Sequence, residues 1–375
     1  MKTKNGKRIL TALFGLTLGL FLLLYLLLPK EEFSENEKRF LACPPEASAG
    51  ALLSGSFSEE AESWAADHMP GRSFFVGLNA YYELFSGRQA MNDIVRGRSG
   101  RLYEAPVRYD KTVVLRNMTA INDFVNTVGR SADLMLVPSA GFVLRDDIPF
   151  PSDPYEDRQI AEAAEAAAGE RVSVLPLSEL FKEDADPESL YYRTDHHWTS
   201  RGARKAAAFY LQVKNRDFLP ESAWTVTEVP DFCGSTWSRA ALWLTPAEKL
   251  ELWDSGTAFT VNNRDHPETE HEGLFYSEYL EESDKYPVFL DGNHSLVRIR
   301  NNSPEASGKI LVIRDSFASC FGCFLAEAYE ETVQVDLRYY RLPVSDLLRD
   351  EHFDEILILY SVNHFMEDAN IIRLE

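Results

Sequence analysis

The chain has 375 residues, of which 45% are hydrophobic and 26% are charged, with a formal net charge of −21. So acidic a protein is a poor ligand for nucleic acid or anionic lipid. Four cysteines in a chain of this length are too few for a disulfide scaffold.

The N-terminus predicts a membrane anchor. Ile9 to Leu28 is a leucine-rich run of twenty residues without a charge, which is long enough to cross a bilayer as a helix. Four basic residues precede it and place that end in the cytoplasm: Lys2, Lys4, Lys7 and Arg8. A cleaved signal peptide is the alternative, but Leu26–Pro29 offers no small-x-small cleavage site. We therefore predict that residues 1–30 form a cytoplasmic tip and an uncleaved signal anchor in the cytoplasmic membrane.

The remainder is then expected to lie outside the cytoplasm as an extracytoplasmic main domain. It carries 33 basic against 59 acidic residues, a net charge of about −26, which suits a neutral or basic partner. Residues 31–110 are predicted to form a stalk or entry region, with helical patterns at Ser58–Trp64 and Phe74–Phe85 and a turn at Gly97–Gly100. Residues 111–375 are predicted to form an α/β domain.

Helices and strands are expected to alternate in this domain, with one interruption. The first part predicts helix Ile121–Val128, strand Leu134–Val137, helix Gln159–Ala168, strand Val172–Leu175, and a helix that Thr199 or Ser200 caps and that runs through Leu211. The last part predicts strand Ile310–Ile313, helix Phe317–Tyr329, strand Val333–Asp336, helix Val344–Arg349 and strand Glu355–Leu359. Such alternation indicates a mainly parallel sheet between helices.

Residues 213–305 break the alternation, since they are rich in Trp, Pro, Asn and acidic residues. We interpret this stretch as an insertion that contacts substrate. Tyr286–Leu290 is its clearest predicted strand.

Three residues form a candidate catalytic triad: Asp195, His197 and Ser316. Ser316 follows an apolar strand and precedes a helical pattern, where a serine can present its hydroxyl at the edge of a sheet. A serine needs an imidazole to take its proton and a carboxylate to orient that imidazole. In an extended backbone, Asp195 and His197 leave the same face and His196 points the other way, so we predict His197 as the base.

Two other kinds of site deserve comparison. Asp195, His196, His197 and His294 could ligate zinc, but adjacent histidines diverge and the chain has no H-E-x-x-H pattern, so we predict neither a metal nor a cofactor. Cys320 and Cys323 form a Cys-x-x-Cys pair, but inside the helix after Ser316 they are better explained as core residues, with a local disulfide left open. A structural turn anchored by Trp198 is the third alternative.

The chain resembles the DHHW protein family, which is allied to the alginate O-acetyltransferase-like branch of the SGNH hydrolase superfamily. The resemblance rests on Thr194–Thr199, Arg314–Phe317 and Val335–Tyr340, with further landmarks at Asn36–Arg39, Asp67–Arg72, Gly100–Tyr103, Val137–Ser139 and Gly292–His294. In the allied acetyltransferases an Asp-x-His pair precedes the serine, as here. The resemblance implies an SGNH hydrolase-like fold, which is flavodoxin-like and permuted.

The resemblance also implies residues around the triad. The oxyanion hole would use the Ser316 N–H and Asn293, while Arg338, Tyr339 and His196 would contact substrate. Asn293 is equally explained as a turn residue, and Arg338 as a salt-bridge partner. Arg314 stands where the allied enzymes often have glycine, which alters the expected turn.

The implied activity is O-acyl transfer, most often of acetyl, to a cell-surface polysaccharide. Acetyl-CoA is not expected outside the cell, so a membrane-bound O-acyltransferase would relay the acyl donor. The alternatives are an extracytoplasmic carbohydrate esterase, in which water replaces the sugar hydroxyl, and a non-catalytic glycan-binding or assembly protein on the same scaffold.

Overall fold

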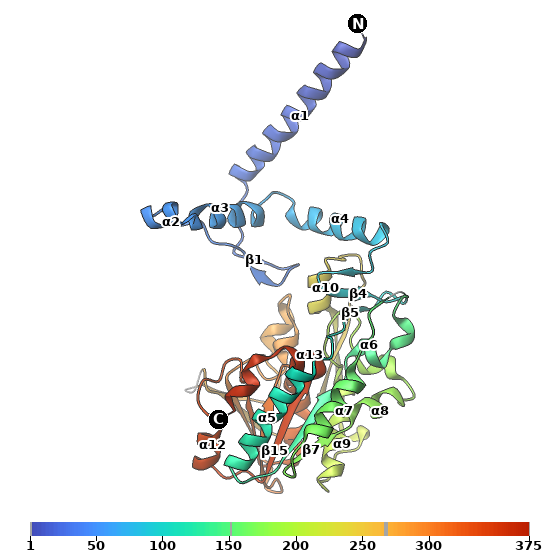
Figure 1. Cartoon of the computed structure of the whole chain (residues 1–375), viewed down its shortest axis with the longest axis vertical. Helices are drawn as coiled ribbons and strands as arrows, with labels where there is room; N and C mark the ends of the chain where they lie inside the picture. The colour runs from blue at the N-terminus through green and yellow to red at the C-terminus, as the bar shows by residue number, and fades with distance from the viewer. Residues whose placement is uncertain (1, 151, 266–268, 375) are drawn as a thin grey trace. The chain divides into compact units, whose positions relative to one another are not determined.

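The computed structural model describes residues 2–150, 152–265 and 269–374. It divides into two compact units, the first made of Met1–Arg88 with Ala241–Trp243 and the second of Gln89–Ala240 with Leu244–Glu375. Figure 1 shows the elements of each unit.

The first unit is helical. Its longest helix is α1 (Lys2–Leu27), in which the 22 residues Gly6–Leu27 are long and apolar enough to cross a membrane. A short hairpin of β1 (Phe33–Ser34) and β2 (Arg39–Phe40) follows, and then α2 (Ala49–Ser54), α3 (Ser56–Asp67) and α4 (Arg72–Phe85). Gly71 makes the sharp turn between α3 and α4 with a φ of 72°, which favours glycine. Both helices predicted in this region are confirmed.

The second unit is built around an eight-stranded sheet with the order β11-β10-β12-β14-β13-β15-β6-β7. Its parallel strands are β6 (Ala132–Val137), β7 (Val172–Leu175), β13 (Lys309–Arg314), β14 (Glu331–Val335) and β15 (Glu355–Ser361). The antiparallel strands are β10 (Phe259–Asn263), β11 (Glu270–Glu272) and β12 (Leu296–Asn301). The predicted mainly parallel sheet is confirmed.

Helices cover both faces of this sheet, so its central strands are buried on both sides. In β13, Ile310 and Val312 join one core cluster while Leu311 and Ile313 join the other, which explains the unbroken apolar run. One face carries α5 (Lys111–Thr127), α7 (Asp157–Ala167), α12 (Val344–Asp350) and α13 (Val362–Glu367). The other carries α6 (Ala140–Val143), α8 (Leu177–Lys182), α9 (Ser200–Val213) and α11 (Phe317–Leu325).

Smaller elements complete the unit. They are β3 (Ala90–Met91), β4 (Ile94–Arg96), β5 (Leu102–Glu104), β8 (Thr225–Phe232), α10 (Ser235–Ala240) and β9 (Glu248–Asp254). The hairpin of β8 and β9 forms a sheet of its own, whereas β10 to β12 extend the central sheet. The stretch predicted as an insertion thus contributes three strands to the domain's main sheet.

The predicted strand at Tyr286–Leu290 is wrong, because Tyr286–Val288 forms a 3₁₀ turn. Pro287 has no N–H to give to a neighbouring strand, and the N–H of Val288 donates to the Lys285 carbonyl. Leu290 and Asp291 then adopt positive φ angles of 58° and 64°, which end any extended run.

Candidate active site

The Ser316 hydroxyl lies at the carboxyl end of β13, where the chain turns into α11. Asp195 and His197 lie in a loop that an isolated β-bridge between Tyr191 and Trp198 closes, and α9 begins two residues later. The Trp198 indole is fully buried and donates its N–H to the Phe317 carbonyl at 3.1 Å. This hydrogen bond therefore joins the loop to the turn after β13 through the residues directly after His197 and Ser316.

The three predicted triad residues form one hydrogen-bonded chain. His197 Nε2 lies 2.7 Å from Ser316 Oγ, and His197 Nδ1 lies 2.6 Å from Asp195 Oδ1. All three side chains are buried, with residue exposures of 7% for Ser316, 5% for His197 and 3% for Asp195. This is the contact order that a nucleophile, its base and the orienting acid require. The catalytic role of the three residues stays a prediction.

A local turn, rather than an extended backbone, brings Asp195 and His197 together. The backbone N–H of His197 donates to Asp195 Oδ1 at 2.9 Å, so the carboxylate binds both the backbone and the ring of the same residue. Asp195 Oδ2 accepts the backbone N–H of Ser235 at 2.6 Å. A Cβ on the preceding Gly234 would approach Asp195 Cβ to 2.2 Å, so only glycine allows this approach.

These contacts set the protonation states. Burial lowers the pKa of His197, which keeps its imidazole neutral and able to accept a proton at neutral pH. Burial opposes ionisation of Asp195, but the neighbouring imidazoles and the hydrogen bonds from His197 and Ser235 hold its pKa well below the usual range. A neutral base beside an ionised carboxylate is the resting state that proton abstraction from a serine needs.

His196 lies beside the triad, and the expectation that it points the other way is wrong. The turn at Asp195 brings its ring to 3.8 Å from the His197 ring, and its Nδ1 lies 2.6 Å from Ser235 Oγ. His196 also borders a small pocket lined by Glu104, Ala140 and Phe317. Its predicted part in placing substrate stays a prediction.

The carboxylate of Asp315 holds the nucleophile turn against the neighbouring strand. Its Oδ1 accepts the N–H of Phe317 at 3.0 Å, and its Oδ2 accepts the N–H of Ser361, at the end of β15, at 2.7 Å. His364 Nδ1 lies 3.2 Å from the same oxygen. Burial opposes the charge, but His364 and the hydrogen bonds from Ser361 hold the Asp315 pKa well below its usual range. Sequence reasoning missed this role, although the residue directly precedes the candidate nucleophile.

Tyr286 is a second residue that sequence reasoning missed. Its ring stacks on the His197 imidazole with centroids 3.9 Å apart and an interplanar angle of 7°. Its hydroxyl is buried and has no hydrogen-bond partner among the described residues. The ring therefore fixes the plane of the base and keeps water from one side of it, whereas the hydroxyl contributes little.

Tyr286→Leu is expected to slow any reaction that uses His197 as its base about five- to tenfold, because an aromatic stack is worth about 1 kcal/mol. Loss of the ring also exposes His197, so the pKa of the base rises and the acid limb of the pH–rate profile moves to higher pH. Tyr286→Phe keeps the ring and is expected to match the wild type. Rates between pH 5 and 8 check this, and an unmoved acid limb in Tyr286→Leu would show that the ring has only a packing role.

Arg314 occupies the position at which the resemblance implies glycine, and its side chain is fully buried. Its Nη1 lies 3.5 Å from Asp336 Oδ2 and 3.1 Å from Asn293 Oδ1. Arg338 binds the same Asp336 carboxylate, with Nη2 at 2.6 Å from Oδ2 and Nε at 2.9 Å from Oδ1. The turn after β13 is thus supported by a buried charge pair at the position where the resemblance implies a glycine.

This network also places the remaining predicted residues. Arg338 is a salt-bridge partner of Asp336, which was one of its two interpretations. Asn293 is exposed and its Oδ1 accepts from Arg314 and, at 3.4 Å, from Arg338, so its amide nitrogen is turned away from both guanidinium groups. Tyr339 is 49% exposed, with the Arg338 guanidinium 5.5 Å from its ring centre. The oxyanion and substrate roles of these residues stay predictions.

Asp336→Asn is expected to lower the free energy of unfolding by about 3–5 kcal/mol, because it leaves the buried Arg314 guanidinium without this carboxylate. Asp346→Asn is the matched control, since it removes an exposed carboxylate that pairs with Arg349 and is expected to cost less than about 0.5 kcal/mol. Urea unfolding midpoints of the purified chain compare the two. Equal midpoints would contradict the account of the buried pair.

The zinc alternative receives partial support in geometry only. Asp195, His196 and His197 each offer a ligand atom within 4.8 Å of the others, but His294 instead contacts Asp265 and Asp291. His197 Nδ1 and Asp195 Oδ1 are 2.6 Å apart, which is a hydrogen-bond distance. Two atoms that both bind one zinc ion, each at about 2 Å from the metal, lie farther from one another than this. These residues therefore fit a triad better than a metal centre.

The two cysteines of α11 are free in the structure. Both are buried, and burial raises the pKa of the Cys320 thiol to about 12 and raises the pKa of the Cys323 thiol well above its usual range. Thiols of this kind are poor nucleophiles, so the pair has the properties of core residues rather than of a redox motif.

The fold and the order of the site residues define an SGNH hydrolase-like α/β domain, and comparison with known proteins agrees. Residues 103–231 match the model of the SGNH hydrolase-like domain of acetyltransferase AlgX, and residues 170–335 match the DHHW protein model. The resemblance to both groups is therefore confirmed. No curated protein matches the chain.

Solved structures share the fold at low sequence identity. A DHHW family protein from Eubacterium siraeum aligns with a TM-score of 0.65 and 19% identity, covering 75% of this chain and 95% of that one. PatB1 from Bacillus cereus aligns with a TM-score of 0.62 and 20% identity, covering 75% of this chain and 99% of that one. The same PatB1 is also known with a sulfonyl adduct, with a TM-score of 0.62, 20% identity and coverage of 75% and 96%.

Proposed function

We propose that the protein is a membrane-anchored, extracytoplasmic O-acyltransferase that adds acetyl groups to a cell-surface polysaccharide through an acyl-enzyme at Ser316. The observation that carries the proposal is the hydrogen-bonded chain from Ser316 through His197 to Asp195, with distances of 2.7 and 2.6 Å. A neutral, buried imidazole at the centre of such a chain has little use other than to move a proton.

The reaction has two halves. Ser316 Oγ attacks the carbonyl carbon of the acyl donor, its proton passes to His197 Nε2, and the leaving group departs with that proton. A sugar hydroxyl then gives its proton to His197 and attacks the acyl ester, which restores the Ser316 hydroxyl. In both halves Asp195 stabilises the imidazolium, and the Ser316 N–H with Asn293 is proposed to bind the oxyanion.

The fold and the comparisons support acyl transfer as the chemistry. The family model that matches residues 103–231 is that of the SGNH hydrolase-like domain of the acetyltransferase AlgX. Sulfonyl reagents modify activated nucleophiles, so the sulfonyl adduct of B. cereus PatB1 is consistent with a reactive side chain on this scaffold. We propose Ser316 as the equivalent reactive group here.

The apolar helix α1 supports a membrane location. We propose that the main domain lies outside, because basic residues precede the span. An acyl donor would then have to cross the membrane, and we propose that a membrane-bound O-acyltransferase relays it. Sugar hydroxyls of the polysaccharide would be the acceptors.

Protease added to intact cells stripped of their wall is expected to digest the region after Lys30, because basic residues hold the N-terminal end inside. Immunoblots with antibody against the C-terminal part of the chain check this. Protection of that region until the membrane is lysed would contradict the outside location.

The acetyl content of surface glycans tests the proposed reaction. A strain that lacks the protein is expected to lose acetyl groups from one polysaccharide, as measured by mass spectrometry, and the wild-type gene is expected to restore them. An excess of acetyl groups would indicate an esterase instead. Unchanged content would favour a non-catalytic scaffold.

A further inference from the structure

One helix of the first unit has its apolar face outward. The exposed side of α4 carries Phe74, Leu78, Tyr82 and Phe85, with exposures of 66%, 54%, 69% and 85%. The residues that α4 buries are the small Gly77 and Ala80. A helix in water shows the opposite arrangement, so this face is built for apolar surroundings.

The same face begins beside the membrane-spanning candidate. The ring of Phe75, at the start of α4, lies 6.0 Å from Phe21 of α1, and Trp64 of α3 meets Tyr25 of α1 edge-on at 5.7 Å. Phe21 stands six residues before the end of α1, which is a rise of about 9 Å. The first turn of α4 is therefore level with the last apolar turns of α1.

A cluster of ion pairs fixes this junction, and it uses the landmark motifs at Asn36–Arg39 and Asp67–Arg72 for which the proposed reaction has no role. Arg39 binds Asp67 through two nitrogens at 2.9 and 2.6 Å, and Arg72 lies 3.5 Å from the same carboxylate. Arg72 also pairs with Glu37. The hydrogen bond from Arg39 lowers the Asp67 pKa, so the cluster stays charged at neutral pH.

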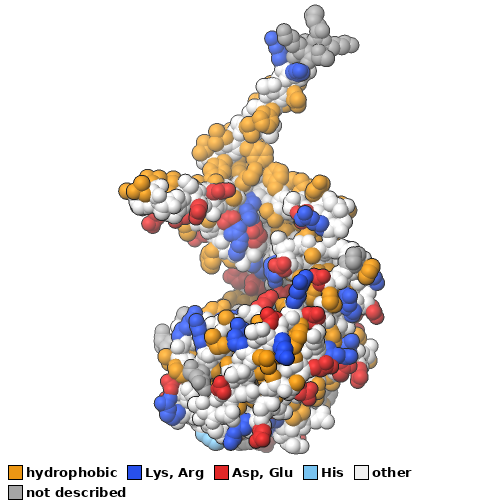
Figure 2. All heavy atoms as spheres, in the orientation of Figure 1, with side chains coloured by type: hydrophobic (Ala, Val, Ile, Leu, Met, Phe, Trp, Pro, Cys, Tyr) orange, Lys and Arg blue, Asp and Glu red, His pale blue; other side chains and the backbone are white. Residues whose placement is uncertain are grey.

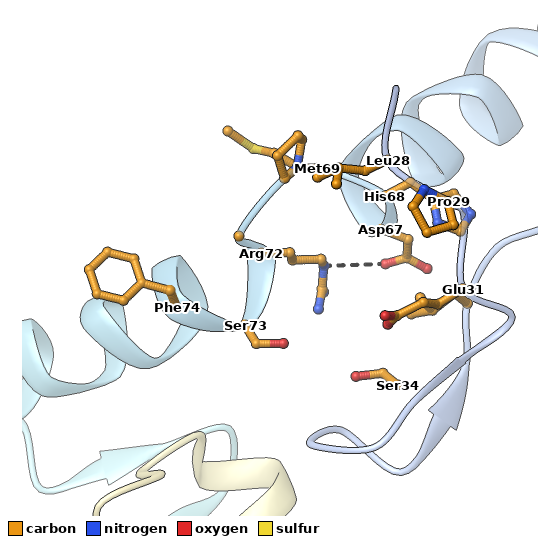
Figure 3. A pocket seen from close by; sticks show the side chains of 13 residues that line it. Leu28, Pro29, Glu31, Ser34, Asp67, His68, Met69, Arg72, Ser73 and Phe74 are labelled. Carbon is orange, nitrogen blue, oxygen red and sulfur yellow. Dashed lines mark ion pairs between the residues drawn. The ribbon is translucent and has the colours of Figure 1, made fainter. Parts of the chain in front are cut away.

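Figure 3 shows Asp67 and Arg72 of this cluster in a pocket that is also lined by Leu28, directly after α1, and by Phe74, at the start of α4. Lys30 is the first charged residue after the apolar span. Its Nζ donates a hydrogen bond to the Tyr25 carbonyl at 2.6 Å and lies 3.6 Å from the centre of the Tyr25 ring. Aromatic residues next to a lysine at the end of a span are typical of the boundary between lipid and water.

Exposed apolar residues are also found on α2. Leu52 and Leu53 of α2 are 63% and 91% exposed, whereas the exposed residues of the intervening α3 include Glu59, Glu60 and Glu62. Figure 2 shows apolar side chains along α1 and on the adjoining surface of α2–α4. The exposed large apolar side chains of the helices in this unit thus lie on α1, α2 and α4, whereas α3 exposes acidic residues.

We propose that α2 and α4 lie on the outer leaflet of the membrane that α1 crosses, with Phe74, Leu78, Tyr82 and Phe85 inserted among the lipids. The occupant is lipid rather than protein, because the face continues the surface of α1 and consists of aromatic and leucine side chains, as interfacial helices do. The nearby acids make an uncharged or zwitterionic leaflet the matching surface. The inference rests on α1 crossing a membrane, and it is independent of the proposed reaction.

Photo-crosslinking of the full chain in phosphatidylcholine vesicles tests this placement. Benzoylphenylalanine replaces Phe85 on the exposed face, Glu83 on the opposite side of the same helix, or Leu18 within α1 as the positive control. We expect lipid adducts at Leu18 and Phe85, detected by mass spectrometry, and at least tenfold fewer at Glu83.

The controls separate the possible failures. Lipid adducts at Leu18, with no more at Phe85 than at Glu83, would overturn the placement of α4 while leaving the anchor intact. A lack of adducts at Leu18 would refute the anchor, and the placement of α4 with it. Benzoylphenylalanine at position 85 could instead crosslink to a protein in native membranes and to no lipid in vesicles. That result would assign this face to a protein partner and would also overturn the inference.

Discussion

Ser316→Ala is expected to lower the rate of acyl transfer by a factor on the order of 10⁴ or more, because in the proposed reaction this hydroxyl carries the acyl group. The variant would keep only substrate binding and the proposed oxyanion stabilisation. The side chain is small and lies at the start of α11, so its removal leaves the fold intact. Initial rates with a chromogenic acetyl ester, and acetyl content of the glycan in cells, measure the loss.

Ser319→Ala is the matched control for this prediction. Ser319 lies on the same helix three residues later and is also buried, at 1% exposure, but the triad does not include it. We expect its rate to stay within about threefold of the wild type. Full acetylation in cells that carry folded, correctly located Ser316→Ala would refute an acyl-enzyme at this residue.

His197→Ala is expected to cost several orders of magnitude in rate, whereas His196→Ala costs far less. The ring of His197 contacts Ser316 Oγ at 2.7 Å, while the Nδ1 of His196 contacts Ser235 Oγ. His196 can therefore affect the position of its neighbour or of the substrate without removing the proton acceptor.

The two histidine variants are also expected to differ in how fast a fluorophosphonate labels Ser316. A fluorophosphonate is expected to label the wild type and His196→Ala, and to label His197→Ala much more slowly, because the serine then lacks its base. Circular dichroism and unfolding midpoints show whether either variant is misfolded. A dead His196→Ala beside an active His197→Ala would reverse the assignment of the base.

The parallel part of the sheet was predictable because four of its five strands, β6, β13, β14 and β15, are buried on both faces. Unbroken apolar runs such as Ile310–Ile313 have no other stable place than between two layers of helices. The start of α9 was predictable for a local reason, since the Thr199 side chain accepts the N–H of Gly202. Position after a strand likewise pointed to Ser316.

Other features depend on contacts between distant residues and left no local signal. The strand predicted at Tyr286–Leu290 is wrong because the strand propensity of the other residues does not account for Pro287, which has no N–H to donate to a neighbouring strand. The stacking of Tyr286 on His197 joins residues 89 positions apart, and the N–H of Ser235 reaches Asp195 across 40. Pairing of β12 with β14 also joined a polar, irregular stretch to the main sheet.

The most direct test of the central claim is the mass of the acylated protein. Trypsin cuts after Arg314 and Arg338, so Ser316 lies in the peptide Asp315–Arg338, in which fragment ions distinguish it from Ser319. After brief exposure to an acetyl ester and acid quenching, we predict one acetyl increment on Ser316, unaffected by chelators and absent in Ser316→Ala. An acetyl group on another residue, or active transfer without any increment on Ser316, would contradict the account.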